Sequence, residues 1–353
     1  MFRQEAVEVL STQSCYESLW SSDNPSDLAR LYYSSRGIED LIRFSRLRPR
    51  AFTRTFTTTG AIYPQIVAVI PTADANKTKK SSLFHALGAI SVVLVESSGP
   101  FFNYSHSVNV GIEEALRLGA EWVVIANDDM SPIDDAEALV REIHSHSEFP
   151  YLLALPDNNL FRSFHTFETA IFSVVRPWEY VIGVSDGIRH LDFDLQMTFV
   201  RQRYLKYHFR FFQVNCNPSL DSNSTMSRWL RTHITYLREG PYSWISPLAQ
   251  PFINFGDFGV FNATLFNRCG LDETFINGGE DLDLSFRLAS KGIKPKIIRF
   301  AVQSLGGKSL SFDRESKRTR QMRDTFNLAY FCHKHTNILM PKADKGRRFR
   351  ESV

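Results

Sequence analysis

The sequence has little cysteine and little net charge, and each shortage argues against a class of protein. Its four cysteines lie far apart and form no Cys-x-x-Cys pair. A zinc site or a disulfide framework is therefore not expected, and a reducing compartment fits. The 41 basic residues nearly balance the 38 acidic ones, which leaves a net charge of +3. A charge this small gives no general electrostatic reason to expect nucleic acid as a partner.

Long apolar segments and a secretory leader are also missing. No apolar run approaches the ~18 residues needed to span a bilayer, and the first residues lack the charged-then-apolar pattern of a signal peptide. A cytoplasmic protein is therefore expected. Basic residues do gather within 43–54 and within 345–350. These groups are either solvated faces or sites of peripheral contact with anionic lipid at the inner membrane face.

The familiar nucleotide and hydrolase motifs are absent as well. No G-x-G-x-x-G, G-x-x-x-x-G-K-[ST] or G-x-S-x-G occurs in the right context, so dehydrogenase, P-loop and α/β-hydrolase interpretations lose support. What is present is the composition of a globular protein, with 43% hydrophobic and 22% charged residues. A chain of 353 residues can bury a large core.

Short apolar runs alternate with helical patterns from residue 65 onward. Continuous β-branched runs predict strands buried in a parallel sheet. These strands are expected at Ile66–Ile70, Ser91–Val95, Trp122–Ala126, Tyr151–Leu155 and Ile297–Phe300. Helices are expected between them, one over residues 107–118 with Gly119 as its C-terminal cap, and one opened by Ser131 and Pro132. The alternation predicts an α/β fold with a mostly parallel sheet flanked by helices.

An acidic cluster, Asn127-Asp128-Asp129, directly follows the predicted strand Trp122–Ala126. Open α/β folds bind ligands at the carboxyl ends of their strands. Hard oxygen ligands at that edge suit Mg²⁺ or Mn²⁺ together with a phosphate-bearing substrate. The alternative is a loop acid that caps the next helix, but Ser131 and Pro132 are expected to serve that start.

A second acidic cluster, Glu280-Asp281-Leu282-Asp283, follows Gly278-Gly279, where a helix over 280–290 is expected to begin. The helix dipole favours acids in a first turn in any case. The glycines, however, allow close approach to a ligand, so the cluster is either a plain helix start or the source of a general base.

Three further polar positions are candidates for the same edge. Glu96 ends the second predicted strand, where its carboxylate could accept hydrogen bonds from a nucleobase or a ribose; an ordinary turn acid is an equal alternative. Asn109 and His106 could face that edge too.

The order of these motifs resembles the family 2 glycosyltransferases of the GT-A fold. Ile70-Pro71-Thr72 is similar to their first strand and turn, Glu96-Ser97-Ser98 to their second, and Asn127-Asp128-Asp129 to their DxD metal motif. The most specific block, similar to their acceptor-side signature, is Gly270-Leu271-Asp272-Glu273-Thr274-Phe275 followed by Gly279-Glu280-Asp281-Leu282-Asp283-Leu284 and Arg287. The resemblance covers roughly residues 64–156 and 252–332. The chain departs from the family pattern at one place. Many members carry a His shortly before a Gly-Gly-x-Ser segment, whereas no His lies near Gly306-Gly307-Lys308-Ser309 on its N-terminal side.

The resemblance implies a GT-A (Rossmann-like) fold and an inverting glycosyltransferase that moves a sugar from a nucleotide-diphosphate sugar to an acceptor hydroxyl. The acceptor would be a glycan or lipid-linked. Asp129 and Asn127 would hold Mg²⁺ or Mn²⁺. Asp281 would be the general base, with Glu280 next in line. The residues expected at the donor are Pro71, Thr72, Glu96, Asn109 and Asp128.

Two other functions stay open from the residues. A nucleotidyltransferase also needs a metal and a nucleotide-binding fold, although Pro71-Thr72-Ala73-Asp74 lacks the glycine-rich loop of that class. A catalytically silent binding protein on the same fold is the other alternative.

Changes of composition divide the chain into five expected segments. They are an N-terminal helical extension (1–60), a nucleotide-sugar-binding half (61–156), an insertion (157–250), an acceptor or catalytic half (251–335) and a basic tail (336–353). The insertion contains an aromatic and basic run, Arg201–Phe212, which suits either a helix laid over the sheet or a strand pair lining a groove. It is either simply packed or an acceptor-binding subdomain.

Overall fold

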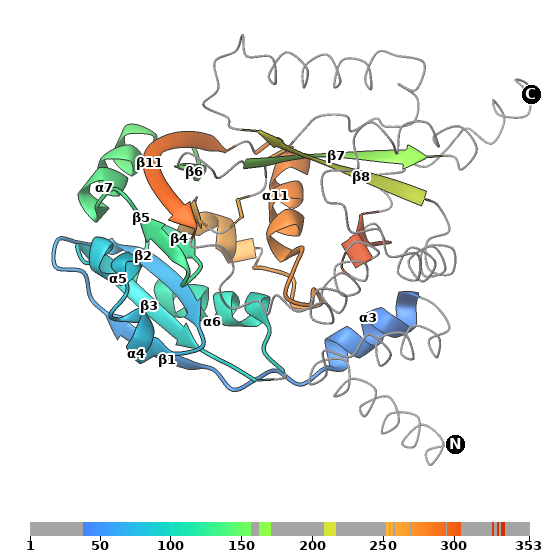
Figure 1. The fold of residues 1–353 in the computed structure, drawn as a ribbon, viewed down its shortest axis with the longest axis horizontal. Coiled ribbons are helices and arrows are strands. Elements are labelled where there is room, and N and C mark those ends of the chain that lie inside the picture. The colour runs from blue at the N-terminus through green and yellow to red at the C-terminus, as the bar shows by residue number, and fades with distance from the viewer. Residues whose placement is uncertain are drawn as a thin grey trace, which may run out of the picture.

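The main body of the protein is one curled eight-stranded sheet with helices around it (Figure 1). The computed structural model describes residues 38–99, 101–156, 162–170, 208–216, 252–253, 255–256, 258–268, 270–293, 295–304, 327, 330–331 and 333–335. Among the described helices, none is long and apolar enough to cross a membrane.

The sheet is mixed, so the expectation of a mostly parallel sheet is confirmed only in part: the five strands expected from the sequence run in one direction, and the other three run against them. In spatial order its strands are β1 (Arg54–Thr58), β3 (Ile90–Glu96), β2 (Tyr63–Thr72), β4 (Trp122–Ala126), β10 (Phe258–Asn262), β6 (Tyr151–Pro156), β11 (Lys296–Ser304) and β5 (Met130–Pro132). The pairs β2–β3, β2–β4 and β6–β11 are parallel. Strand β10 runs antiparallel to both its neighbours, and the edge strands β1 and β5 are antiparallel too. The three antiparallel strands, β1, β5 and β10, are not among the strands expected from the sequence.

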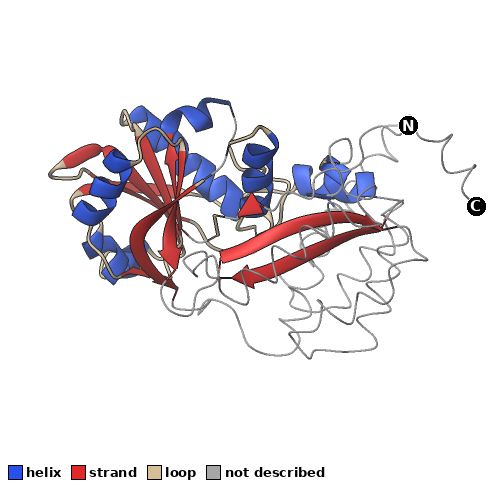
Figure 2. Ribbon diagram, turned by 90° about the horizontal axis from the view of Figure 1, so that it is seen from above, coloured by secondary structure: helices blue, strands red, loops and turns tan. Residues whose placement is uncertain are grey.

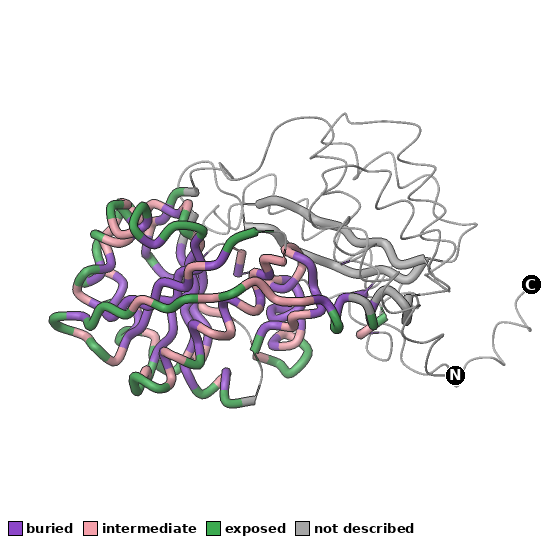
Figure 3. Tube along the Cα trace, turned by 90° about the horizontal axis from the view of Figure 1, so that it is seen from below, coloured by how far each residue is buried: buried purple, intermediate pink, exposed green. Residues whose placement is uncertain are grey.

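Alternate residues of the strands build two hydrophobic cores, one on each face of the sheet. One face of β2 packs with the helices α4 (Ala75–Thr78), α5 (Ser82–Ala86) and α7 (Ala136–Ser145). The other face packs with α6 (Tyr104–Arg117), α11 (Glu280–Ser290) and the 3₁₀ helix η2 (Ala263–Arg268). Figure 2 shows helices on both sides of the sheet, and Figure 3 shows the buried positions gathered in it. Burial on both faces explains why β2 and β4 read as unbroken apolar runs.

The helix starts differ from expectation at one place. Ser131 and Pro132 do not open a helix, because they lie in β5, where Ser131 pairs with Gln303. The helix α7 begins later, and Asp135 is its N-cap, accepting a hydrogen bond from the Ala138 amide. By contrast, Gly119 follows α6 with φ of 79°, as its predicted capping role requires.

A second, smaller sheet contains β8 (His208–Cys216), β7 (Arg162–Ala170) and β9 (Phe252–Ile253), in that order. Strands β7 and β8 pair antiparallel along their whole length. Of the two alternatives for the aromatic and basic run, the described part is therefore a strand pair. Residues 201–207 and the basic tail lie outside the described residues.

Candidate functional site

The carboxyl ends of β2, β3 and β4 meet at one edge of the sheet. Thr72, the last residue of β2, pairs with Glu96, the last residue of β3. Strand β4 is parallel to β2, so Asn127-Asp128-Asp129 emerges at the same edge. Because β10 starts opposite the end of β4, the turn that leads into it arrives there as well. The predicted first acidic cluster therefore occupies the edge at which open α/β sheets bind ligands.

Asp128 is held by the end of β2. Its Oδ2 accepts a hydrogen bond of 2.8 Å from the Thr72 hydroxyl, which lies 2.7 Å from the hydroxyl of Thr78. Partial burial raises the pKa of Asp128; the neighbouring charge of Asp129 adds to this rise, whereas Thr72 and Lys77 oppose it. Burial and a neighbouring carboxylate both disfavour the charged form of Asp128, and a cation bound beside it would be stabilising.

Glu96 and Pro71 have structural contacts at this edge. The Glu96 Oε2 accepts a hydrogen bond of 2.9 Å from the Ala75 amide at the start of α4, so the carboxylate supports the loop that follows β2. Pro71 is buried within β2 opposite Val95. The hydrogen bond from Ala75 supports the interpretation of Glu96 as an acid that holds a turn. A contact between Glu96 and a nucleoside stays a prediction.

The second acidic cluster contains three acids in different surroundings. Glu280 is buried, and its Oε2 accepts a 2.6 Å hydrogen bond from the Gly278 amide. Asp283 is fully buried and contacts Arg287 and His335, each at 2.8 Å, with Lys334 alongside. Burial acts to raise the pKa of Asp283, but His335, Arg287 and Lys334 together lower it below its usual value. Asp281 is only half-buried.

The chain before α11 turns sharply. Asn277 and Gly279 have φ values of 46° and 87°, in the left-handed region that glycine and asparagine tolerate best. Gly279 is the N-cap of α11, as the sequence predicts, so Glu280 and Asp281 stand in the first helical turn.

Tyr104, the first residue of α6, joins the two acidic clusters. Its backbone amide donates to Asn277 Oδ1 at 2.9 Å, directly before Gly278. Its hydroxyl donates to Asn127 Oδ1 at 2.7 Å, at the start of the first cluster. Tyr104 therefore links the residue that opens the first cluster to the loop that precedes the second.

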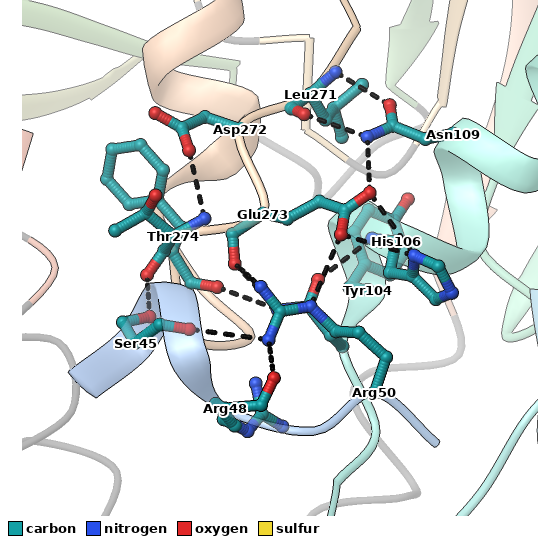
Figure 4. Close-up of polar contacts among 12 residues, drawn as sticks. Ser45, Arg48, Arg50, Tyr104, His106, Asn109, Leu271, Asp272, Glu273 and Thr274 are labelled. Atoms are coloured by element: carbon teal, nitrogen blue, oxygen red, sulfur yellow. Dashed lines mark hydrogen bonds and ion pairs between the residues drawn. The ribbon is translucent and has the colours of Figure 1, made fainter. Parts of the chain in front are cut away.

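Glu273 is the centre of a clamp on the loop that precedes α11 (Figure 4). Its carboxylate accepts hydrogen bonds from Asn109 Nδ2 at 3.1 Å and Arg50 Nε at 3.2 Å, and His106 Nδ1 lies 3.2 Å from each of its oxygens. Burial acts to raise the pKa of Glu273, but the hydrogen bonds from Asn109, His106 and Arg50 lower it below its usual value. We define the Glu273 clamp as Glu273 with Arg50, His106 and Asn109.

Side chains also hold the backbone of this loop. Asn103, the N-cap of α6, donates to the carbonyls of Glu273 and Phe275, and Ser45 donates to the carbonyl of Thr274. Asn109 both donates to and accepts from the backbone of Leu271. The recorded contacts of Asn109 thus lie on the loop before α11, and its expected role at the donor stays a prediction.

Several contacts were outside the reach of sequence reasoning. Tyr104, Asn277, Arg50 and Thr78 were not singled out, because each acts on a partner far away in the chain or on a turn. Only Asn103 had a local signal, a good N-cap residue before a helical pattern. Within the described part of the chain, no group of three or more His, Cys, Asp or Glu residues is placed to share a metal ion. Asp129 and Asn127 as metal ligands stay predictions.

Comparison with known proteins gives little. No protein-family model matches the chain, and no curated protein matches it. Among solved structures the chain is similar to a mannose-1-phosphate geranyltransferase from Thermus thermophilus, at 15% identity and a TM-score of 0.21. The match covers 57% of this chain and about half, 51%, of that protein. A likeness this weak carries no argument about activity.

Proposed function

We propose that the chain is a metal-dependent inverting glycosyltransferase of the GT-A type, similar to family 2. It would move a sugar from a nucleotide-diphosphate sugar to an acceptor hydroxyl. The observation that supports the proposal is the double contact of Tyr104, which links Asn127, the first residue after β4, to Asn277 in the loop before α11. A transferase needs a donor-side and an acceptor-side group close to each other.

The residues after β4 fit a hard divalent cation. Asp128 and Asp129 supply carboxylate oxygens and Asn127 an amide oxygen, which are the ligands that Mg²⁺ and Mn²⁺ prefer. In this proposal Asp129 and Asn127 hold the ion, while Thr72 fixes the orientation of Asp128 through its 2.8 Å hydrogen bond. A metal bound there would neutralise charge on the departing diphosphate.

Asp281 is the proposed general base. Glu280 is the weaker candidate, because its carboxylate is buried and already accepts the Gly278 amide. Asp281 is more accessible, and the helix dipole favours the charged form of an acid in the first turn. The proposed work of Asp281 is to accept the proton of the attacking hydroxyl.

The test is donor binding and turnover with purified protein. UDP-, GDP- and dTDP-sugars are screened by calorimetry with Mn²⁺, with Mg²⁺ and with EDTA, and nucleoside diphosphate release is measured. At least one donor should bind only with metal, and Asp129→Asn should abolish that binding. Glu121→Gln, an exposed acid at the opposite end of β4, is the matched control. Donor binding that persists unchanged in EDTA would contradict the metal site.

The same assay separates the nucleotidyltransferase alternative. A glycosyltransferase releases a nucleoside diphosphate from the donor. A nucleotidyltransferase instead releases pyrophosphate from a nucleoside triphosphate and a sugar 1-phosphate. Pyrophosphate release without any donor turnover would favour the second function.

A further inference from the structure

The stretch between Asp40 and Asp74 contains five arginines and no acidic residue. The structure separates these arginines into two groups. Arg48 is buried and donates to a main-chain carbonyl, and Arg50 donates to Glu273, so these two anchor the segment to the body of the protein. The other three are exposed: Arg43, Arg46 and Arg54.

Two large apolar side chains are exposed in the same stretch. Leu47 is 65% exposed and Phe52 is 81% exposed, the two highest values among the large apolar side chains of the described residues. Isolated apolar residues on a surface need no explanation. Here, however, both stand among exposed arginines, and the segment between them is fastened from within by Arg48 and Arg50. We call Arg43, Arg46, Leu47, Phe52 and Arg54 the docking surface.

The docking surface borders the edge of the sheet that carries the candidate site. Strand β1 runs antiparallel to β3, and Arg54 pairs with Glu96, the last residue of β3. Arg54 therefore lies at the carboxyl edge, and Phe52 precedes it. The helix α3 (Ile38–Leu47) contacts the loop before α11 through Ser45 and Thr274. In Figure 1, α3 lies beyond the end of the sheet, on the side of α11.

We propose that the docking surface binds the surface of an anionic membrane. The three arginines would contact lipid phosphates, which guanidinium groups bind well, while Leu47 and Phe52 enter the interfacial region. A nucleic acid would explain the arginines, and a base could stack on Phe52, but Leu47 would be left without a partner. Bound in this way, the protein places the carboxyl edge of its sheet next to the bilayer. A further step rests on the proposed function: the acceptor of the transferred sugar is then lipid-linked.

The test uses the full chain and co-sedimentation with vesicles. Vesicles of phosphatidylcholine alone are compared with equimolar phosphatidylcholine and phosphatidylglycerol, at low and high salt. Binding should require the anionic lipid and fall with salt, because exposed charges are screened. Each arginine removed from Arg43, Arg46 and Arg54 by change to Gln should weaken binding about fivefold. The double variant Leu47→Ser and Phe52→Ser should weaken the binding that remains at high salt.

Matched controls use exposed residues elsewhere on the molecule. Arg141→Gln, Lys291→Gln and Arg299→Gln remove the same charge, and Ile62→Ser with Ile133→Ser removes two other exposed apolar side chains. Neither control should change vesicle binding. Equal binding to neutral and anionic vesicles, or equal losses in the control variants, would overturn the docking surface. So would binding to a single-stranded oligonucleotide that matches vesicle binding and ignores the Leu47 and Phe52 changes.

Vesicle binding needs no donor, so its result is independent of the proposed activity. If vesicles bind as expected but no donor is turned over, the docking surface stands, whereas the proposed transferase and its lipid-linked acceptor fall. If a soluble glycan acceptor is used while vesicles do not bind, the docking surface falls and the proposed transferase stands.

Discussion

At the scale of single residues, the two acids at the start of α11 have different surroundings although they are adjacent in the chain. Glu280 is buried against its own loop, whereas Asp281 is half-buried. One sequence cannot rank two neighbouring acids, because the helix dipole favours both. Burial and hydrogen bonding, which depend on the folded loop, supply the ranking.

The first prediction separates these acids. Asp281→Asn should lower the transfer rate by ~10²–10⁴-fold, the usual effect of removing a general base, while the donor still binds with metal. Glu280→Gln should mainly weaken the contact with the Gly278 amide and lower the free energy of unfolding by about 1 kcal/mol. Single-turnover kinetics and urea unfolding measure the two effects. If Glu280→Gln abolishes transfer and Asp281→Asn does not, the roles are reversed.

The second prediction concerns Tyr104. Tyr104→Phe keeps the backbone contact with Asn277 but removes the hydrogen bond from the hydroxyl to Asn127. We expect a loss of about 1 kcal/mol in the free energy of unfolding. Transfer should slow by up to ~10²-fold, because small misplacements of reacting groups are costly. Tyr63→Phe, at the opposite end of β2, is the control. Wild-type turnover in Tyr104→Phe would show that the clusters do not work together.

At the scale of elements, the sequence predicted what local patterns encode. The strand Trp122–Ala126 and the helix Glu280–Ser290 have the expected bounds. The predicted start of α7 was wrong. Ser131 and Pro132 are a good local signal for a helix start, but they pair with β11 as part of a strand, and Asp135 is the N-cap instead. Long-range pairing overrides local propensity here.

The Glu273 clamp gives the third prediction, a pH dependence. In the folded protein the pKa of Glu273 lies below its ordinary value of 4.5. The ionised carboxylate therefore stabilises the fold at pH values above 4.5, and this stabilisation is lost as the pH falls through the folded pKa. Glu273→Gln should therefore be less stable than wild type at neutral pH, by about 1 kcal/mol for this partly exposed group. The difference should shrink progressively below pH 4.5.

Urea unfolding of both proteins between about pH 3 and 7, a range on both sides of the ordinary glutamate pKa of 4.5, checks this. Glu148→Gln, which changes an exposed acid after the end of α7, is the matched control and should track wild type throughout. A stability difference between Glu273→Gln and wild type that stays constant down to the lowest pH would show that ionisation of Glu273 does not stabilise the loop.

At the scale of the whole molecule, α6 connects the parts that the proposed reaction needs. Its buried face packs on β2 and β3, and its first turns hold both the loop before α11 and Asn127. The sequence predicted the helix and the two acidic clusters but not that one helix joins them. Such contacts link residues far apart in the chain, and no local periodicity encodes them. The edge of the sheet was predictable because buried strands end where polar residues begin.

The fourth prediction tests α6 as that connection. Gly111 lies on its buried face, and a Cβ there would stand 2.3 Å from Val69 Cγ1 and 2.9 Å from Val95 Cγ2. Alanine is favoured in a helix by up to ~1 kcal/mol over glycine, but overpacking a buried contact typically costs about 1–3 kcal/mol. Both valines are fully buried side chains within strands, so they have little room to move and overpacking should win. Gly111→Ala should thus lower stability and, by tilting α6, weaken donor binding as well.

Glu113→Ala, exposed on the same helix, should leave both unchanged. Urea unfolding and calorimetry decide, and a Gly111→Ala protein that is as stable as wild type and binds donor normally would mean that α6 can shift on the sheet without disturbing the site.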